Sequence, residues 1–166
     1  MPNLIENGGV EEWIDGEAAP KGFGQESNQY SKLMKESSTI AEGKFAMRQV
    51  WSANDGLDSF WNQLHTVVND IRPGRQYKLS FKAVNRSKNT LVVLVSAINS
   101  ATEKTLAQRP PLARILVAPC DKFQEFSGVF SVTDAEPLSI IINVCCQTPD
   151  TDFPMEIVWD DWQLHY

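Results

Sequence analysis

The sequence predicts an all-β protein built as an antiparallel β-sandwich. Apolar and polar residues alternate with a period of two along several segments, whereas helical periodicity is scarce. Turn signals rich in Gly, Pro, Asn and Asp separate these segments. About eight strands in a chain of 166 residues indicate a sandwich or barrel rather than an α/β enzyme fold. With no internal repeat and no low-complexity linker, residues 1–166 are expected to form a single domain.

The alternation predicts where each strand lies and which face it buries. It is clearest at residues 75–83, 126–132 and 137–144, and further strands are expected at 44–51, 61–69, 90–98, 114–117 and 157–166. The polar segment 16–42 has little strand signal and is expected to be a long loop with one helical turn near residues 30–34. The side chains that the three clearest segments direct to the core are Tyr77, Leu79, Phe81, Ala83, Phe126, Phe130, Val132, Leu138, Ile140, Ile142 and Val144.

The charge balance excludes two classes of partner. The chain has 15 Lys and Arg against 21 Asp and Glu, a formal net charge of -6. A nucleic-acid binder normally carries a basic patch, and a protein held on a membrane surface by charge carries a polybasic segment. No apolar stretch is long enough to cross a bilayer, and the first residues have neither the basic nor the apolar region of a signal peptide. The sequence therefore predicts neither a nucleic-acid nor a membrane partner.

The three cysteines do not indicate a disulfide framework. Cys145 and Cys146 are adjacent and would point to opposite faces of a strand, where a mutual bridge is strained. Cys120 could pair with one of them only if the fold brings them together. Buried free thiols are the interpretation that we adopt.

Four segments resemble one known family. Residues 3–13 (NLIENGGVEEW) are similar to the NLLxNGxFE…W opening of jelly-roll carbohydrate-binding modules appended to xylanases and glucanases. Residues 157–164 (IVWDDWQL) resemble their closing strand hxIDDVxL, residues 42–47 (EGKFAM) resemble EGxxSL, and residues 72–81 (RPGRQYKLSF) resemble xPGxTYTVSF. The chain departs from the family at Val10, where Phe is usual, and at Trp159 and Trp162, which replace Ile and Val. The resemblance implies a galactose-binding-domain-like jelly roll.

The resemblance also implies a structural calcium ion. The family joins its first and last strands near a buried Ca²⁺, an ion that takes six to eight oxygen ligands from carboxylates and carbonyls. At the matching positions of this chain, the resemblance implies that the side chains of Glu11, Glu42 and Asp160 would bind the ion, together with backbone carbonyls near Gly9 and Phe45. The alternative is that these are ordinary surface carboxylates, with Asp160 in a turn.

One face of the sandwich has the chemistry of a sugar site. If Leu64, Thr66 and Val68 face the core, alternation places Trp61, Gln63 and His65 on the opposite face. An aromatic ring packs on the C–H side of a pyranose, while amide and imidazole groups bond its hydroxyls. Neighbouring strands are expected to add Lys82 and Asn143, with Trp51 as a second wall. The alternatives are that Trp61 packs under the preceding loop and that Trp51 is structural, whereas Trp13, Trp159 and Trp162 are expected to cap or build the core.

The sequence predicts a binding module rather than an enzyme. It has no G-x-S-x-G nucleophile motif and no phosphate-binding Gly loop, and Asp160 and Asp161 would point apart as strand neighbours. The resemblance implies an extracellular or cell-surface module that binds an oligo- or polysaccharide and targets an attached or partner glycoside hydrolase. The alternatives are a protein–protein adhesion or assembly module and an inert spacer with the same fold.

Overall fold

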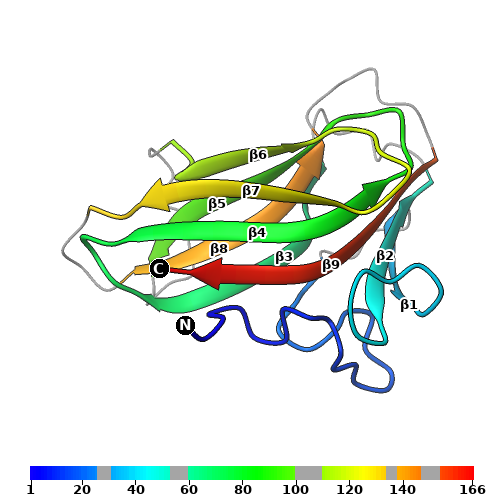
Figure 1. Cartoon of the computed structure of the whole chain (residues 1–166), viewed down its shortest axis with the longest axis horizontal. Coiled ribbons are helices and arrows are strands. Elements are labelled where there is room, and N and C mark those ends of the chain that lie inside the picture. Colours follow the sequence, from blue (N-terminus) through cyan, green and yellow to red (C-terminus); the bar gives the residue numbers. More distant parts are fainter. Residues whose placement is uncertain (26–30, 53–59, 100–109, 134–137, 147–153) are drawn as a thin grey trace.

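The fold is a sandwich of two antiparallel β-sheets (Figure 1). The computed structural model describes residues 1–25, 31–52, 60–99, 110–133, 138–146 and 154–166, with only the backbone at 60–63, 99, 138 and 146. In the five-stranded sheet the order is β1 (Ser31–Glu36), β2 (Ala46–Trp51), β9 (Met155–His165), β4 (Gln76–Asn85) and β7 (Gln124–Ser131). In the four-stranded sheet it is β3 (Phe60–Ile71), β8 (Leu138–Cys146), β5 (Leu91–Asn99) and β6 (Ala113–Val117).

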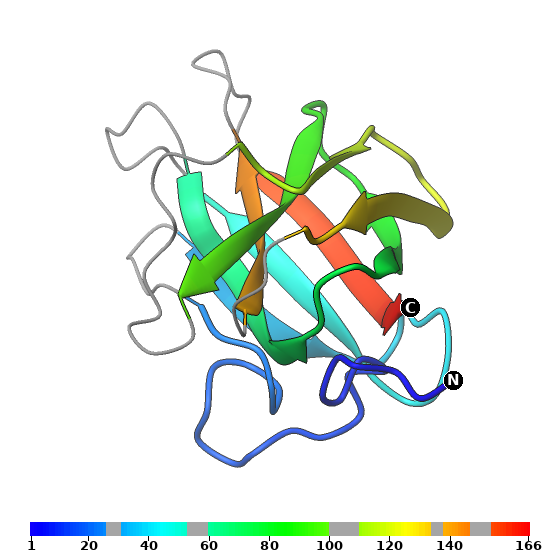
Figure 2. The same cartoon turned by 90° about the vertical axis from the view of Figure 1, so that its left-hand side faces the viewer.

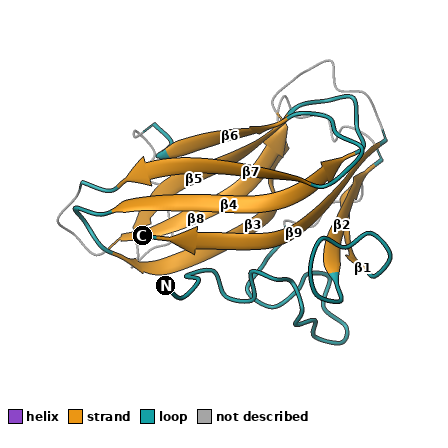
Figure 3. Ribbon diagram, in the orientation of Figure 1, coloured by secondary structure: helices purple, strands orange, loops and turns teal. Residues whose placement is uncertain are grey.

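The predicted all-β class is confirmed, since the described residues contain strands and loops but no helix (Figure 3). Consequently, no helix in the described ranges could cross a membrane. The two sheets lie face to face with the core between them, as Figure 2 shows from one end.

Alternation selected the core correctly along most strands. In β4, Tyr77, Leu79, Phe81 and Ala83 are all at least 99% buried, and the intervening side chains point outward. In β3, Leu64 and Val68 are buried in the core and Thr66 is buried beside them. Burying each large apolar side chain stabilises the fold by about 1.5–3 kcal/mol, which explains why the period of two determines the faces.

One strand was not predicted. The segment expected to hold a helical turn near residues 30–34 instead forms β1, which pairs with β2 from Ser31 opposite Trp51 to Glu36 opposite Ala46. This strand lies at the sheet edge, and Leu33 is its one buried apolar residue. An edge strand needs few apolar residues, because it pairs with only one other strand and packs only one face against the core.

The two ends of the chain are joined, as the resemblance implied. The Asn3 side chain donates from Nδ2 to the Trp162 carbonyl at 2.7 Å and accepts from the Leu164 N–H at 2.9 Å. The Leu4 N–H donates to the Leu164 carbonyl at 3.0 Å. A Cβ atom at Gly8 would lie 2.0 Å from the Trp162 carbonyl oxygen, so this position of the opening motif requires glycine. The opening segment therefore extends the sheet beside β9.

The two cysteines whose side chains the structure describes, Cys120 and Cys145, are thiols. Cys145 is fully buried and Cys120 is half-buried, and neither forms a disulfide. The side chain of Cys146 lies outside the described residues.

Candidate functional site

The outer face of the four-stranded sheet carries a row of side chains contributed by all four strands. His65 on β3 is the register partner of Asn143 on β8, Asn143 is opposite Leu94 on β5, and Leu94 is opposite Arg114 on β6. One chain neighbour of each row residue lies in the core, namely Leu64, Val144, Val93 and Ile115. Because neighbouring residues of a strand point to opposite faces, the row lies on the outer face of the sheet. Imidazole, amide and guanidinium groups therefore line up across one sheet.

The centre of this face is buried, with Asn143 only 8% exposed, whereas its margins carry more accessible polar side chains. Val92, Leu94 and Cys145 form a small cluster outside the main core and are at most 6% exposed. Arg114 is exposed at the β6 margin, and His65 is half-buried at the β3 margin. The hydroxyl-bonding groups of His65 and Arg114 are therefore the accessible polar groups of this face that could contact a sugar.

The N-terminal segment pairs with β3 at His65 through an isolated antiparallel bridge. The backbones of Gly24 and His65 exchange two hydrogen bonds of 2.8 and 2.9 Å. A Cβ atom at Gly24 would lie 2.5 Å from Nε2 of His65, so only glycine allows this approach. The His65 Nδ1 atom is buried without a hydrogen-bond partner among the described residues.

Trp61 and Gln63 belong to β3, but their side chains lie outside the described part of the structure. Phe60 is opposite Cys146 and Leu64 is opposite Val144, so four steps along β3 correspond to two along β8. This irregularity interrupts the simple alternation from which the Trp61, Gln63 and His65 face was predicted.

Two predicted ligand residues lie elsewhere. Trp51 has no exposed surface and packs in the main core, so it does not form a wall of a cleft. Lys82 points outward from β4, in the five-stranded sheet, and therefore lies on the opposite side of the sandwich from His65 and Asn143. Alternation shows which residues share a face of one strand, but it does not show to which sheet the strand belongs.

The predicted metal ligands do come together around one turn. The Glu11 carboxylate accepts the N–H groups of Lys44 and Phe45 on Oε1, at 2.7 and 3.1 Å. Asp160 on β9 accepts the N–H groups of Ala41 and Glu42 on Oδ2, at 2.8 and 3.0 Å. The opening segment and the last strand thus hold the 41–45 turn from both ends.

Asp160 is fully buried, and its own neighbour supplies a further donor. The Asp161 N–H donates to Oδ1 of Asp160 at 2.7 Å. Burial raises the pKa of the Asp160 carboxyl, and the N–H groups of Glu42, Ala41 and Asp161 offset only part of that rise. Both carboxylate oxygens are thus occupied by hydrogen-bond donors.

Asp160 and Asp161 do not point apart, contrary to the prediction. Ser80 is opposite Gln163 and Lys82 is opposite Asp160, so β9 has one more residue than β4 over this stretch. Asp161 adopts a φ of 50°, in the left-handed region that Asp tolerates better than most residues. This β-bulge turns both carboxylates toward the outer face.

The donor set does not fit a calcium ion. N–H groups donate hydrogen bonds and cannot ligate a cation, yet they bond Oε1 of Glu11 and both oxygens of Asp160. The third carboxylate, Glu42, accepts a hydrogen bond from the Lys82 ammonium, and the Phe45 N–H donates to Glu11. Gly9 is exposed beside these groups, and no cluster of three metal-binding side chains occurs among the described residues.

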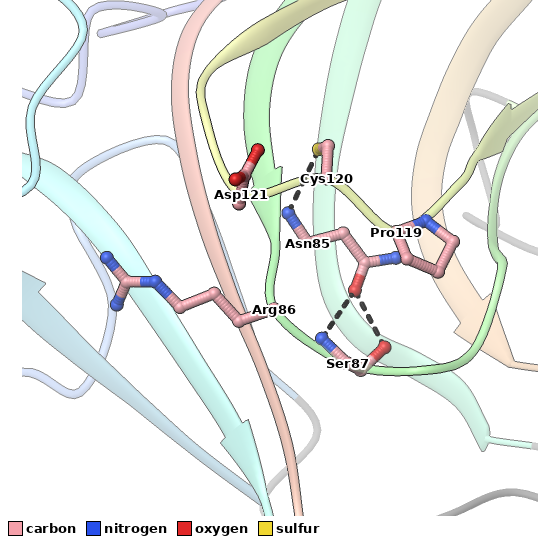
Figure 4. A pocket seen from close by; sticks show the side chains of 6 residues that line it. All are labelled: Asn85, Arg86, Ser87, Pro119, Cys120 and Asp121. Atoms are coloured by element: carbon pink, nitrogen blue, oxygen red, sulfur yellow. Dashed lines mark hydrogen bonds between the residues drawn. The ribbon is translucent and has the colours of Figure 1, made fainter.

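A separate pocket of about 490 Å³ opens at one end of the sandwich (Figure 4). The Asn85 N–H donates to Sγ of Cys120 at 3.3 Å, and Oδ1 of Asn85 accepts from Ser87. Arg86 is turned to Glu156, with Nη1 and Oε1 2.5 Å apart. The Asn85 side chain, which donates from Nδ2 to the Asn89 and Val117 carbonyls, therefore shapes the 85–89 loop.

The residue of the polar row that the sequence did not identify is Arg114. The alternation of Ala113–Val117 predicts that Arg114 points outward while Ile115 is buried, as observed. Placing Arg114 in a row with His65 requires the order β3-β8-β5-β6, which local sequence does not contain. The inward and outward faces were therefore predictable, whereas the row was not.

Comparison with solved structures identifies the fold. The chain is similar to the enzymatically active domain of tailspike protein 4 from bacteriophage CBA120, with a TM-score of 0.71 and 12% identity over 98% of this chain and 21% of that chain. It is also similar to TmCBM61, solved in complex with β-1,4-galactotriose, with a TM-score of 0.61 and 16% identity over 99% of both chains.

A third similar structure holds CBM22-1 and GH10 modules of the Clostridium thermocellum endo-1,4-β-D-xylanase 10B, complexed with xylohexaose. Its TM-score is 0.56 and its identity 14%, over 87% of this chain and 26% of that chain. No protein-family model and no curated protein sequence matches. The chain therefore has the jelly-roll β-sandwich fold found in carbohydrate-binding modules.

Proposed function

We propose that the chain is a non-catalytic carbohydrate-binding module that holds a neutral oligo- or polysaccharide on the outer face of the four-stranded sheet. The observation that supports this proposal is the register of His65 with Asn143 and, across the sheet, of Leu94 with Arg114. His65 and Arg114 place hydrogen-bonding side chains at the two margins of this face, and Leu94 and Asn143 lie between them at 3% and 8% exposure.

The β3 margin is the part of this face where we expect the sugar to stack. Trp61 lies on β3 four residues before His65, and an indole supplies the flat apolar surface on which a pyranose ring packs. Gln63, between them, would supply an amide. The net charge of -6 favours a neutral ligand over an anionic one.

The similar structures support the class of ligand. TmCBM61 was solved with β-1,4-galactotriose, and the xylanase modules with xylohexaose. Both are neutral β-linked oligosaccharides. A module of this kind works outside the cell and raises the local concentration of an attached or partner glycoside hydrolase on its substrate.

The test is affinity electrophoresis in gels that contain β-1,4-galactan, xylan, β-glucan or mannan. We expect at least one polysaccharide to retard the chain, and Trp61→Ala or His65→Ala to abolish the retardation. The matched control is Lys78→Ala, because Lys78 is exposed on the opposite sheet. Retardation that survives both site variants would contradict this face as the site. No retardation by any polysaccharide would favour the assembly or spacer function instead.

A further inference from the structure

Lys82 lies where three carboxylates approach the 41–45 turn. It is the register partner of Asp160, and its Nζ is 3.0 Å from Oδ2 of Asp161 and pairs with Oε1 of Glu42. Because β4 neighbours β9 in the sheet, a single ammonium joins the β9 bulge to the turn. This is the region in which the resemblance implied a calcium ion.

The other two carboxylates in this region, those of Asp160 and Glu11, accept hydrogen bonds from backbone N–H groups. Asp160 accepts three of them and Glu11 accepts two. A buried carboxylate needs such partners, because leaving it without them costs several kcal/mol by the usual estimate. The Lys82 ammonium therefore pairs with Glu42 and Asp161, while backbone N–H groups bond Asp160 and Glu11, and together these contacts tie the two ends of the sandwich to the turn.

The side chains around Lys82 suit a permanent cation. Its side chain is 26% exposed and that of Asp161 is 16% exposed, so the pair is only partly screened by water. Hydrogen bonds to Glu42 and Asp161 raise the pKa of Lys82 well above its ordinary value. The ammonium consequently stays charged at any pH at which the protein is used.

We propose that Lys82 replaces the structural metal ion in this chain, so that its ammonium and the N–H groups of the turn hold β4, β9 and the 41–45 turn together without calcium. The inference rests on contacts in the five-stranded sheet and is independent of sugar binding on the other sheet. Loss of one would leave the other intact.

The test compares thermal unfolding of the whole chain in excess calcium chloride and in excess EDTA. We expect the same midpoint in both, and isothermal titration calorimetry to detect no saturable calcium binding. Lys82→Met should lower the midpoint by about 2–4 °C, the shift that corresponds to about 1 kcal/mol in a chain of this size. Lys82→Arg, which keeps the charge, should retain most of the stability.

The matched control is Lys78→Met, on the same face of the same strand, where the lysine is exposed and has no ion pair among the described residues. A midpoint that rises in calcium and falls in EDTA would overturn the proposal, and so would saturable calcium binding by the wild-type chain. Equal effects of Lys82→Met and Lys78→Met would also overturn it. The calorimetric measurement needs no variant, so it decides the question even if Lys82→Met does not fold.

Discussion

The rings of Trp159 and Trp162 lie 5.5 Å apart, centroid to centroid, on the same side of β9. In a regular strand, residues three apart point to opposite faces. The bulge at Asp161 supplies the one extra residue that returns Trp162 to the core, and both indoles are at least 99% buried. The motif Trp-Asp-Asp-Trp is therefore the sequence of a bulge that directs two rings inward and two carboxylates outward.

Deleting Asp161 should be far more damaging than substituting it. Without the extra residue, Trp162 and the residues after it would change faces, which exposes core side chains. We expect the deletion to lose cooperative unfolding and the near-ultraviolet circular dichroism of packed indoles. Asp161→Gly keeps the left-handed backbone at φ 50° and should unfold cooperatively. A cooperative deletion variant would contradict this interpretation of the motif.

The two sheets approach closely at Gly128. Gly128 is on β7 and Ile115 is on β6 of the other sheet. A Cβ atom at Gly128 would lie 2.8 Å from Cγ1 of Ile115. Gly128→Val should lower the free energy of unfolding by about 1–3 kcal/mol through overpacking. In a double-mutant cycle measured by urea unfolding, Ile115→Ala should relieve part of that cost, whereas additive effects would show that the two side chains do not meet.

Trp51 should affect stability and not sugar affinity. Its ring is fully buried in the core, and its Nε1 atom is buried without a hydrogen-bond partner among the described residues. Trp51→Phe leaves a smaller side chain in that space and should cost about 1–3 kcal/mol by thermal or urea unfolding. Retardation in polysaccharide gels should stay as in the wild type. A folded Trp51→Phe chain that is no longer retarded would contradict this prediction and indicate that Trp51 contributes to sugar binding.

The Glu156 ion pairs should stabilise the fold near neutral pH and cease to do so in acid. Burial raises the pKa of Glu156, but hydrogen bonds from Arg48 and Arg86 outweigh it and hold the pKa below its ordinary value. A carboxyl with a depressed pKa contributes stability above its unfolded value of about 4.3, and that contribution is lost as the pH falls through the folded value.

The change that isolates this contribution is Glu156→Gln. At 26% exposure, the carboxylate should contribute about 0.5–1 kcal/mol. The stability difference between wild type and variant should be constant from about pH 6 to 8 and should shrink below about pH 4. Urea unfolding at several pH values measures it. A difference that grows in acid would have the wrong sign for this assignment.

Local sequence was sufficient for most strands because each buries one face. The spacing of Tyr77, Leu79 and Phe81 predicts strand β4, and all three side chains are buried as expected. It was insufficient for Trp51, because its inward neighbour in β2 is Gln49, a polar residue that is fully buried and accepts from Nε1 of Trp159 at 3.0 Å. A polar residue on the inner face removes the contrast on which alternation depends.

The candidate site was predictable only where it depends on one strand. The outward position of His65 follows from Leu64 and Thr66, which are buried. The separation of Lys82 from His65 follows from sheet order, which is set by pairings between residues distant in the chain. Glu11 and Asp160 both bond N–H groups of the turn that contains Glu42, but the resemblance could not anticipate that Lys82 would pair with Glu42.

The central claim is that a neutral glycan binds the outer face of the four-stranded sheet, and a nuclear magnetic resonance titration tests it most directly. Xylohexaose and β-1,4-galactotriose would be added in turn to the isotope-labelled chain while backbone amide shifts are followed. The account predicts saturable shifts at His65, Leu94, Arg114 and Asn143, with β1, β2, β4, β7 and β9 unchanged. Shifts confined to the five-stranded sheet or to the Asn85–Cys120 pocket, or none with either sugar, would contradict it.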